Sequence, residues 1–120
     1  MILVDTSVWV EHLKSDLPAL SHLLDGGRVL SHPFIIGEVA LGRLRQREVV
    51  LSALSELPRA SPATDPETFA FIESQALFGR GIGYVDCHLL AAVRLTAGSK
   101  LWTLDRRLHT VAEELGLAMA

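Results

Sequence analysis

The sequence has little cysteine and no long apolar run. Its single cysteine, Cys87, cannot form an internal disulfide framework, and such scarcity is typical of proteins in a reducing cytoplasm. No stretch approaches the roughly 18 uninterrupted apolar residues of a membrane-spanning helix. The N-terminal segment MILVDTSVWV lacks the basic residues of a signal peptide and has an acid at position 5. We therefore expect a cytoplasmic protein that does not associate with membranes.

An excess of positive charge is also missing. The 120 residues include 11 Lys and Arg against 14 Asp and Glu, which gives a formal net charge of −3. A nucleic acid would therefore have to be bound by a local group of cations and not by overall charge. Hydrophobic residues make up 49 % of the chain, which is enough for a buried core. The length is that of one ordinary domain.

Apolar segments with strand character alternate with segments of helical periodicity. Strands are expected at residues 1–4, 28–31 and 100–104 and after Gly116, with a further candidate at 57–60. Helices are expected between them, at residues 8–13, 17–24, 34–45, 48–57, 65–78, 84–97 and 105–115. This alternation predicts an α/β fold. We expect a three-layer α/β/α sandwich, in which helices cover both faces of a short, mainly parallel sheet.

Four acids stand alone in apolar stretches. Asp5 is the only charged residue among positions 1–10, and Asp105 directly follows the apolar segment LWTL. Glu38 is isolated in PFIIGEVALG, and Asp86 in GIGYVDCHLLAAV. Asp5 and Asp105 each end a predicted strand, and ligands of open α/β sheets bind at the carboxyl ends of the strands. The apolar neighbours of Glu38 predict that its side chain points from an apolar helix face instead of into water.

Each acid also has a simpler explanation. Asp5, Asp86 and Asp105 all begin predicted helices, where a carboxylate caps free N–H groups. Glu38 lies within a helix, where an arginine partner would be the usual compensation. Four carboxylates at one site would repel each other unless cations neutralised them, and ligands that are all oxygen suit Mg²⁺ or Mn²⁺. Taken together, the pattern favours a metal site, but it leaves the function open.

Four segments resemble the signature stretches of PIN-domain proteins, in particular the VapC toxins of toxin–antitoxin pairs. They are MILVDTSVWVEHL, SHPFIIGEVALGRL, GIGYVDCHLLAAVRL and KLWTLDRRL. The resemblance covers the whole chain in the right order, and it implies that residues 1–120 form a single PIN-like nuclease domain. It also implies a metal-dependent ribonuclease that uses Mg²⁺ or Mn²⁺ to cleave RNA phosphodiester bonds.

The resemblance assigns roles residue by residue. Asp5 resembles the first acid of the family, Glu38 the acid of the E-hydrophobic-x-x-G helix, and Asp86 and Asp105 the two later acids. All four are therefore expected to be catalytic and to bind the metal, with Asp105 as the acid that acts most indirectly. The hydroxyl groups expected beside the metal belong to Thr6, Ser7 and Thr103. The pair Cys87-His88 replaces small or aliphatic residues, which leaves a role for His88 open.

The family resemblance further implies partners. A toxin of this type is held inactive by a small VapB-like antitoxin, and it forms a homodimer that becomes a heterotetramer or larger with the antitoxin. A PIN nuclease that processes RNA without a toxin role is an alternative. A receiver-like phospho-acceptor domain and a catalytically inactive binding module are alternatives from other classes.

Several arginines are candidates for contact with RNA phosphates. Arg80, Arg106 and Arg107 are close in sequence to Asp86 and Asp105, although a solvated charged surface would explain them as well. Further candidates, with less reason to lie near the acids, are Arg43, Arg45 and Arg47.

Overall fold

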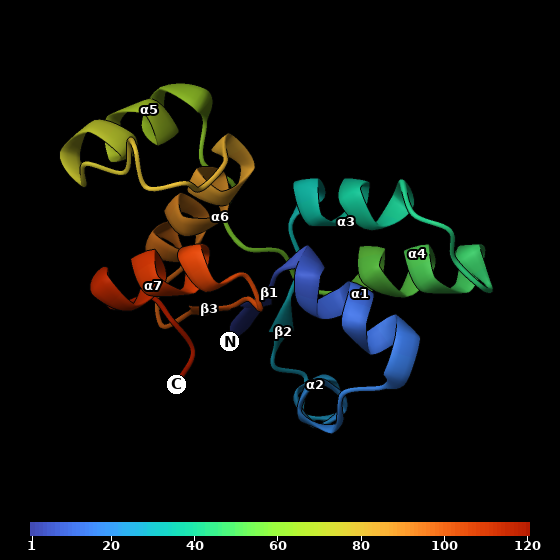
Figure 1. The fold of residues 1–120 in the computed structure, drawn as a ribbon. Helices are drawn as coiled ribbons and strands as arrows, with labels where there is room; N and C mark the ends of the chain where they lie inside the picture. The colour runs from blue at the N-terminus through green and yellow to red at the C-terminus, as the bar shows by residue number, and fades with distance from the viewer.

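Three parallel strands form the sheet, in the order β2–β1–β3 (Figure 1). The computed structural model describes all 120 residues. The strands are β1 (Ile2–Val4), β2 (Val29–Leu30) and β3 (Lys100–Trp102). The helices are α1 (Thr6–Ser15), α2 (Pro18–Asp25), α3 (Pro33–Ala40), α4 (Arg47–Glu56), α5 (Asp65–Ser74), α6 (Tyr84–Leu95) and α7 (Arg106–Glu114). Because all strands run the same way, their carboxyl ends meet at one edge.

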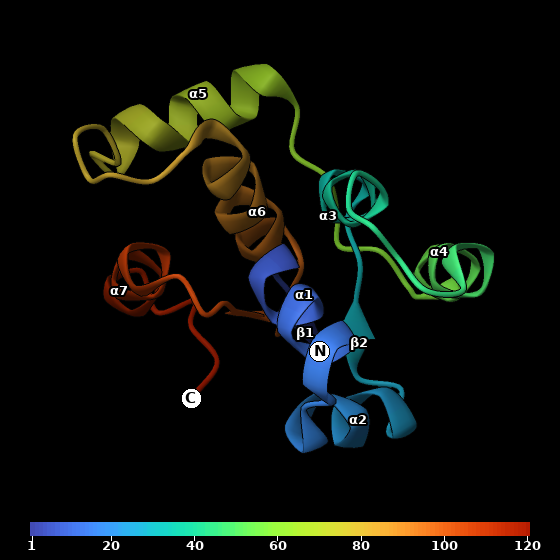
Figure 2. The ribbon, with the colours of Figure 1, turned by 45° about the vertical axis from the view of Figure 1, so that its right-hand side comes forward.

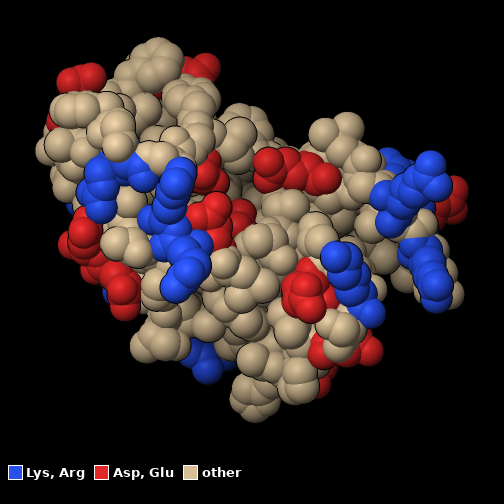
Figure 3. All heavy atoms as spheres, in the orientation of Figure 1, with Lys and Arg blue, Asp and Glu red and all other residues tan.

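One pair of helices lies on each side of that carboxyl edge. Helix α5 packs on α6, and α3 packs on both α1 and α4. Figure 2 shows the α5–α6 pair on one side of the molecule and the α3–α4 pair on the other. In the space-filling view, acidic side chains lie in a hollow between the two sides (Figure 3). The carboxyl edge of the sheet therefore opens between two pairs of helices.

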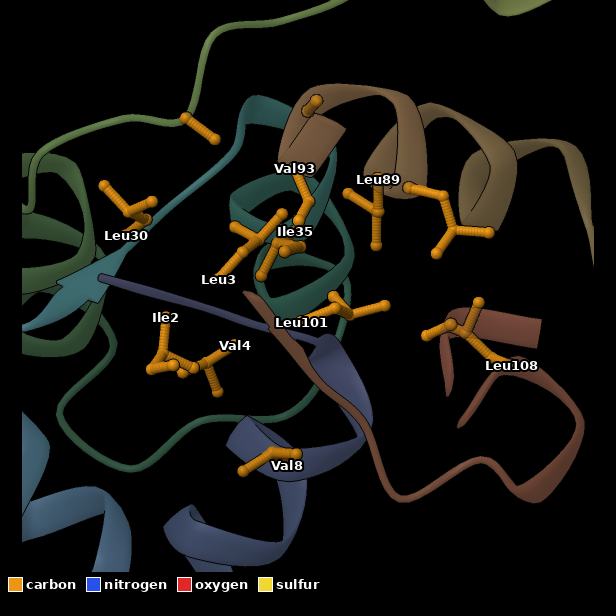
Figure 4. Packing of buried hydrophobic residues seen from close by; sticks show 14 of the residues in the cluster. Ile2, Leu3, Val4, Val8, Leu30, Ile35, Leu89, Val93, Leu101 and Leu108 are labelled. Atoms are coloured by element: carbon orange, nitrogen blue, oxygen red, sulfur yellow. The ribbon is translucent and has the colours of Figure 1, made fainter. Parts of the chain in front are cut away.

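Helices cover both faces of the sheet. Leu3 of the central strand points toward Ile35 of α3 (Figure 4). Ile2 and Val4 point to the opposite face, where Val8 of α1 lies. All five side chains belong to one buried cluster. A parallel sheet that is buried on both faces needs apolar residues at every strand position, and β1 reads ILV. The structure confirms the predicted three-layer sandwich.

Several expected elements are shorter than predicted. The helix expected at 34–45 ends at Ala40, and residues 41–46 form a turn before α4. The helix expected to reach residue 78 ends at Ser74. The strands expected at 57–60 and after Gly116 are single parallel bridges, which join Ser31 to Arg59 and Leu101 to Ala118. No helix combines the length and the apolar character needed to cross a membrane.

The unusual pair Cys87-His88 is buried. Cys87 belongs to the core cluster, and His88 joins α6 to α5. Its Nδ1 lies 3.2 Å from Thr68 Oγ1, and its Nε2 lies 2.9 Å from Asp65 Oδ1. The Tyr84 hydroxyl donates to the same Asp65 oxygen at 2.6 Å. Together, the hydrogen bonds from Tyr84 and His88 lower the pKa of Asp65. His88 is therefore part of the packing between α5 and α6, and Cys87 is part of the core.

Candidate active site

Asp5 lies at the carboxyl end of β1 and is 7 % exposed. It occupies the N-cap position of α1, yet its side chain caps no backbone N–H group. Its Oδ2 instead accepts hydrogen bonds from the Ser7 and Thr103 hydroxyls, each 2.7 Å long. Helix capping therefore does not explain this buried acid. Its second oxygen, Oδ1, accepts no hydrogen bond from the chain.

Asp105 follows β3 closely and is exposed. Its Oδ1 accepts the N–H groups of Arg107 at 2.9 Å and Leu108 at 3.1 Å, so it caps α7. The capping alternative is correct for this residue, although the cap uses only one carboxylate oxygen. Thr103 joins the two strand-end acids, because its hydroxyl donates to Asp5 and accepts the N–H of Asp105 at 3.1 Å.

Asp86 lies in the first turn of α6 and is half-buried. Its Oδ2 accepts the N–H of Gly83 at 2.8 Å, so it too makes a capping hydrogen bond. Burial raises the pKa of Asp86, and the negative charges of Asp5, Asp105 and Glu38 raise it further against the opposing effect of the Gly83 hydrogen bond. The other three acids therefore lie within electrostatic reach of Asp86.

Glu38 is exposed to solvent. The prediction that its side chain points from an apolar helix face instead of into water was therefore wrong. Ile35 and Val39 are the residues of α3 that face the core, and the turn after α3 leaves Leu41 in solvent. Glu38 Oε1 accepts a hydrogen bond of 2.6 Å from the Thr6 hydroxyl, which links α3 to the start of α1. The alternative of an arginine partner was also wrong, because no arginine forms an ion pair with Glu38.

None of the four carboxylates has a cationic partner in the chain. The ion pairs of the chain lie elsewhere and join Arg80 to Glu114, His88 to Asp65 and His109 to Glu113. The atoms at the acidic hollow that could coordinate a metal ion are carboxylate and hydroxyl oxygens, which suit hard divalent cations. No three His, Cys, Asp or Glu side chains lie close enough together to enclose an ion by themselves. No ion pair within the chain therefore neutralises the four acids.

Three arginines gather beside α7. Arg80, Arg106 and Arg107, here called the α7 arginines, line one hollow of about 210 Å³. An ion pair of 2.6 Å with Glu114 holds Arg80 in place. Gly81 leaves room for Arg107, because a Cβ atom there would lie 2.7 Å from Arg107 Nη1. The structure thus brings together the three arginines that were predicted to contact phosphates.

A second hollow, of about 520 Å³, adjoins Glu38. Its cationic lining consists of Lys14 of α1 and of Arg43 and Arg45 from the turn after α3. These two arginines were expected to lie farther from the acids, and Lys14 was not among the candidates predicted from the sequence. Helical spacing gives no signal for Lys14, because eight residues after Thr6 correspond to a rotation of about 80° around α1.

A family model described as PIN domain matches residues 2–114 of the chain. The chain belongs to the PIN-domain family. All four acids of this PIN domain lie within the matched range, as do the three hydroxyl residues beside them. The family assignment favours a nuclease over the receiver-like phospho-acceptor.

Full-length relatives agree with this assignment. The chain is 44 % identical over 120 residues to Ribonuclease VapC32 of Mycobacterium tuberculosis strain CDC 1551 / Oshkosh, and equally to Ribonuclease VapC32 of strain ATCC 25618 / H37Rv. Each comparison covers 100 % of this chain and 97 % of the relative. The match confirms the resemblance to VapC-type PIN-domain proteins that the sequence motifs indicated.

Proposed function

We propose that this PIN domain is a metal-dependent endoribonuclease that cleaves RNA phosphodiester bonds. The observation that carries the proposal is that three other carboxylates lie within electrostatic reach of the half-buried Asp86, and that none of the four has a cationic partner. Like charges in a half-buried site are unfavourable unless cations neutralise them. RNA as the substrate is supported by the name of the relative, Ribonuclease VapC32. Residues 1–120 would act as one nuclease domain.

The donors fit Mg²⁺ or Mn²⁺ as the resident ion. Mg²⁺ usually keeps several waters and takes one or two protein carboxylates together with substrate phosphate oxygens. This habit agrees with acids that approach one another without enclosing an ion. When bound, the ion supplies an acidified water and a positive charge for the phosphate oxygens.

The hydrogen bonds of the four acids suggest which of them would bind the metal ion directly. Ser7 and Thr103 occupy one oxygen of Asp5 and leave Oδ1 for the ion. Asp86 keeps Oδ1 in the same way while Oδ2 accepts the Gly83 N–H. These two acids would hold the ion directly.

Glu38 and Asp105 would contribute from the two sides of the hollow. Glu38 is held by the Thr6 hydroxyl, so it would complete the metal shell or orient the attacking water. Asp105 commits Oδ1 to the cap of α7. It would therefore act through Oδ2 or through a water.

Cleavage of total bacterial RNA by the purified chain tests the proposal. Cleavage should need Mg²⁺ or Mn²⁺ and stop in EDTA. The variants Asp5→Asn and Asp86→Asn should each lose at least about a hundredfold in rate, more than is usual for residues that only orient ligands. Asp25→Asn, an exposed carboxylate on α2, is the matched control and should cleave normally. Equal cleavage by the native chain and both site variants would overturn the mechanism.

We further propose that the chain is the toxin of a toxin–antitoxin pair and acts in the cytoplasm, where its single cysteine stays reduced. Its partners would be a VapB-like antitoxin and a second copy of itself, in a heterotetramer or larger assembly. Induced expression should arrest growth, and Asp5→Asn should abolish the arrest. RNA cleavage without any effect on growth would instead support a PIN nuclease in RNA processing.

A further inference from the structure

Basic side chains flank the acidic hollow on two sides (Figure 3). On one side lie the α7 arginines described above. On the other side lie Lys14, Arg43 and Arg45, which line the hollow of about 520 Å³ beside α3. This hollow is called the groove below, and the three residues are called the groove cations. Figure 3 shows basic groups over α7 and, across the central acids, around α3 and α4.

The groove beside α3 shares one residue, Glu38, with the acidic centre. Glu38 belongs to its lining and also lies within electrostatic reach of Asp86. Apolar side chains complete the lining, among them Val10, Leu13 and Leu44. A surface that combines cations with apolar groups suits a single strand of nucleic acid, because bases and riboses pack on the apolar part while phosphates face the cations.

The groove cations are free to bind an external anion. None of the three forms an ion pair with a carboxylate of the chain, and all three are exposed. Arg80 on the opposite side, by contrast, is paired with Glu114. In a chain of formal net charge −3, three unpaired cations in one groove are a local attraction for a polyanion.

We propose that the groove cations bind the phosphate backbone of single-stranded RNA on the far side of the acidic centre from the α7 arginines. The inference rests on the proposed ribonuclease function. A strand that lies in this groove and reaches the centre passes Glu38, whose side chain lines the groove. Cations before and after the acids would hold both flanks of the strand, so that the scissile phosphate stays at the negatively charged centre.

RNA binding by substituted chains tests the inference. Lys14→Ala, Arg43→Ala, Arg45→Ala and the combined variant are made in an Asp5→Asn background, so that the RNA stays intact. Fluorescence anisotropy with a fluorescein-labelled single-stranded RNA of mixed sequence gives the affinity over a series of salt concentrations. Each substitution should weaken binding and reduce the slope of log affinity against log salt by about 0.7. The combined variant should lose on the order of tenfold in affinity.

The matched control is Arg28→Ala. Arg28 is exposed and directly precedes β2, so it lies at the amino edge of the sheet, opposite the acids. It should keep the affinity and salt slope of the Asp5→Asn chain. The conservative variants Arg43→Lys and Arg45→Lys should retain most of the binding, and equal melting temperatures of all variants would show that the fold is intact.

Cleavage separates this inference from the proposed function. With Asp5 intact, the combined variant should raise KM and leave kcat nearly unchanged, because the cations act on binding. If the native chain cleaves RNA and the combined variant matches it in affinity, salt slope and KM, the groove assignment alone is wrong. A variant that keeps RNA binding but loses a protein partner would assign the groove to that partner and overturn the inference. A native chain that neither binds nor cleaves RNA would overturn both proposals.

Discussion

Thr103 connects the two strand-end acids through one hydroxyl group. It is 5 % exposed, donates to Asp5 Oδ2 at 2.7 Å and accepts the N–H of Asp105 at 3.1 Å. Ser7 Oγ lies 3.3 Å from the same hydroxyl. Buried polar groups that are satisfied on both sides fix the orientation of their neighbours. Thr103 therefore acts as a positioning residue for the acids.

Thr103→Val should lower both activity and stability. Valine keeps the shape of the side chain but removes the hydroxyl, so Asp5 loses one donor and the Asp105 N–H loses its acceptor. We expect a rate loss of about 10- to 100-fold and a fall in unfolding free energy of about 1–3 kcal/mol. Initial cleavage rates and urea unfolding measure these effects, with Thr103→Ser as the control that keeps the hydroxyl. A native rate in the valine variant would contradict this role.

The sequence identified the acids as candidates but could not separate capping from other roles. Asp5 and Asp105 both follow a strand and begin a helix, yet only Asp105 caps its helix. The difference comes from Thr103, which is 98 positions from Asp5 in the chain, and no local pattern reveals such a contact. Glu38 was misjudged for a related reason. Its apolar neighbours Phe34 and Leu41 are themselves exposed, so they do not mark the buried side of α3.

Helix α3 begins at a buried histidine. His32 is 1 % exposed, and its Nδ1 accepts the N–H of Phe34 at 3.0 Å. The ring proton is therefore on Nε2, which is buried and has no hydrogen-bond partner. Burial, together with the nearby charges of His88 and Arg59, lowers the pKa of His32 to about 4. The start of α3 is thus built around a neutral imidazole.

Stability should fall as the pH decreases from about 6.5 to about 4. The unfolded chain takes up a proton at His32 below its ordinary pKa of 6.5, whereas the folded chain does so only near 4. The unfolded state therefore binds more protons in this window, which costs up to about 3 kcal/mol of unfolding free energy. Urea unfolding at a series of pH values measures it.

The variant His32→Asn isolates this contribution. Asparagine keeps an acceptor at the N-cap but does not titrate, so the loss of stability between pH 6.5 and 4 should become smaller. The exposed His22→Asn is the matched control for exchanging histidine for asparagine. If the two variants showed the same pH dependence, the assignment to His32 would be wrong.

The order of the elements followed from apolar patterning, whereas their ends did not. The turn at 41–46 depends on the left-handed backbone of Gln46, with φ of 53°, which is uncommon for a residue with a side chain. The strand candidate at 57–60 becomes a single bridge because Pro58 has no N–H group to extend the ladder. Both outcomes depend on backbone details that hydrophobic periodicity does not record.

At the scale of the whole molecule, repulsion among the four acids lowers the stability of the fold. Three acids lie within electrostatic reach of the half-buried Asp86, and none of the four acids forms an ion pair with a cation of the chain. Neutralising one acid should therefore stabilise the chain while removing its activity, as is common where a functional site stores strain or repulsion.

Asp86→Asn tests this balance. The amide oxygen can still accept the Gly83 N–H, while the charge that burial and three other acids disfavour is gone. In EDTA the variant should gain about 1 kcal/mol, seen as a melting temperature several degrees higher.

Divalent ions should reverse the order of stability, so that the native chain becomes more stable than Asp86→Asn. At a Mg²⁺ concentration of about 100 times its dissociation constant, the native chain should gain about 2.7 kcal/mol, whereas Asp86→Asn should gain less because it offers one carboxylate fewer. Thermal melts in EDTA and over a Mg²⁺ series measure both effects, with Asp25→Asn as the control for a neutralised carboxylate away from the hollow. A variant that melts lower than the native chain in EDTA, and responds equally to Mg²⁺, would show that repulsion at the carboxyl edge does not limit the stability of this PIN domain.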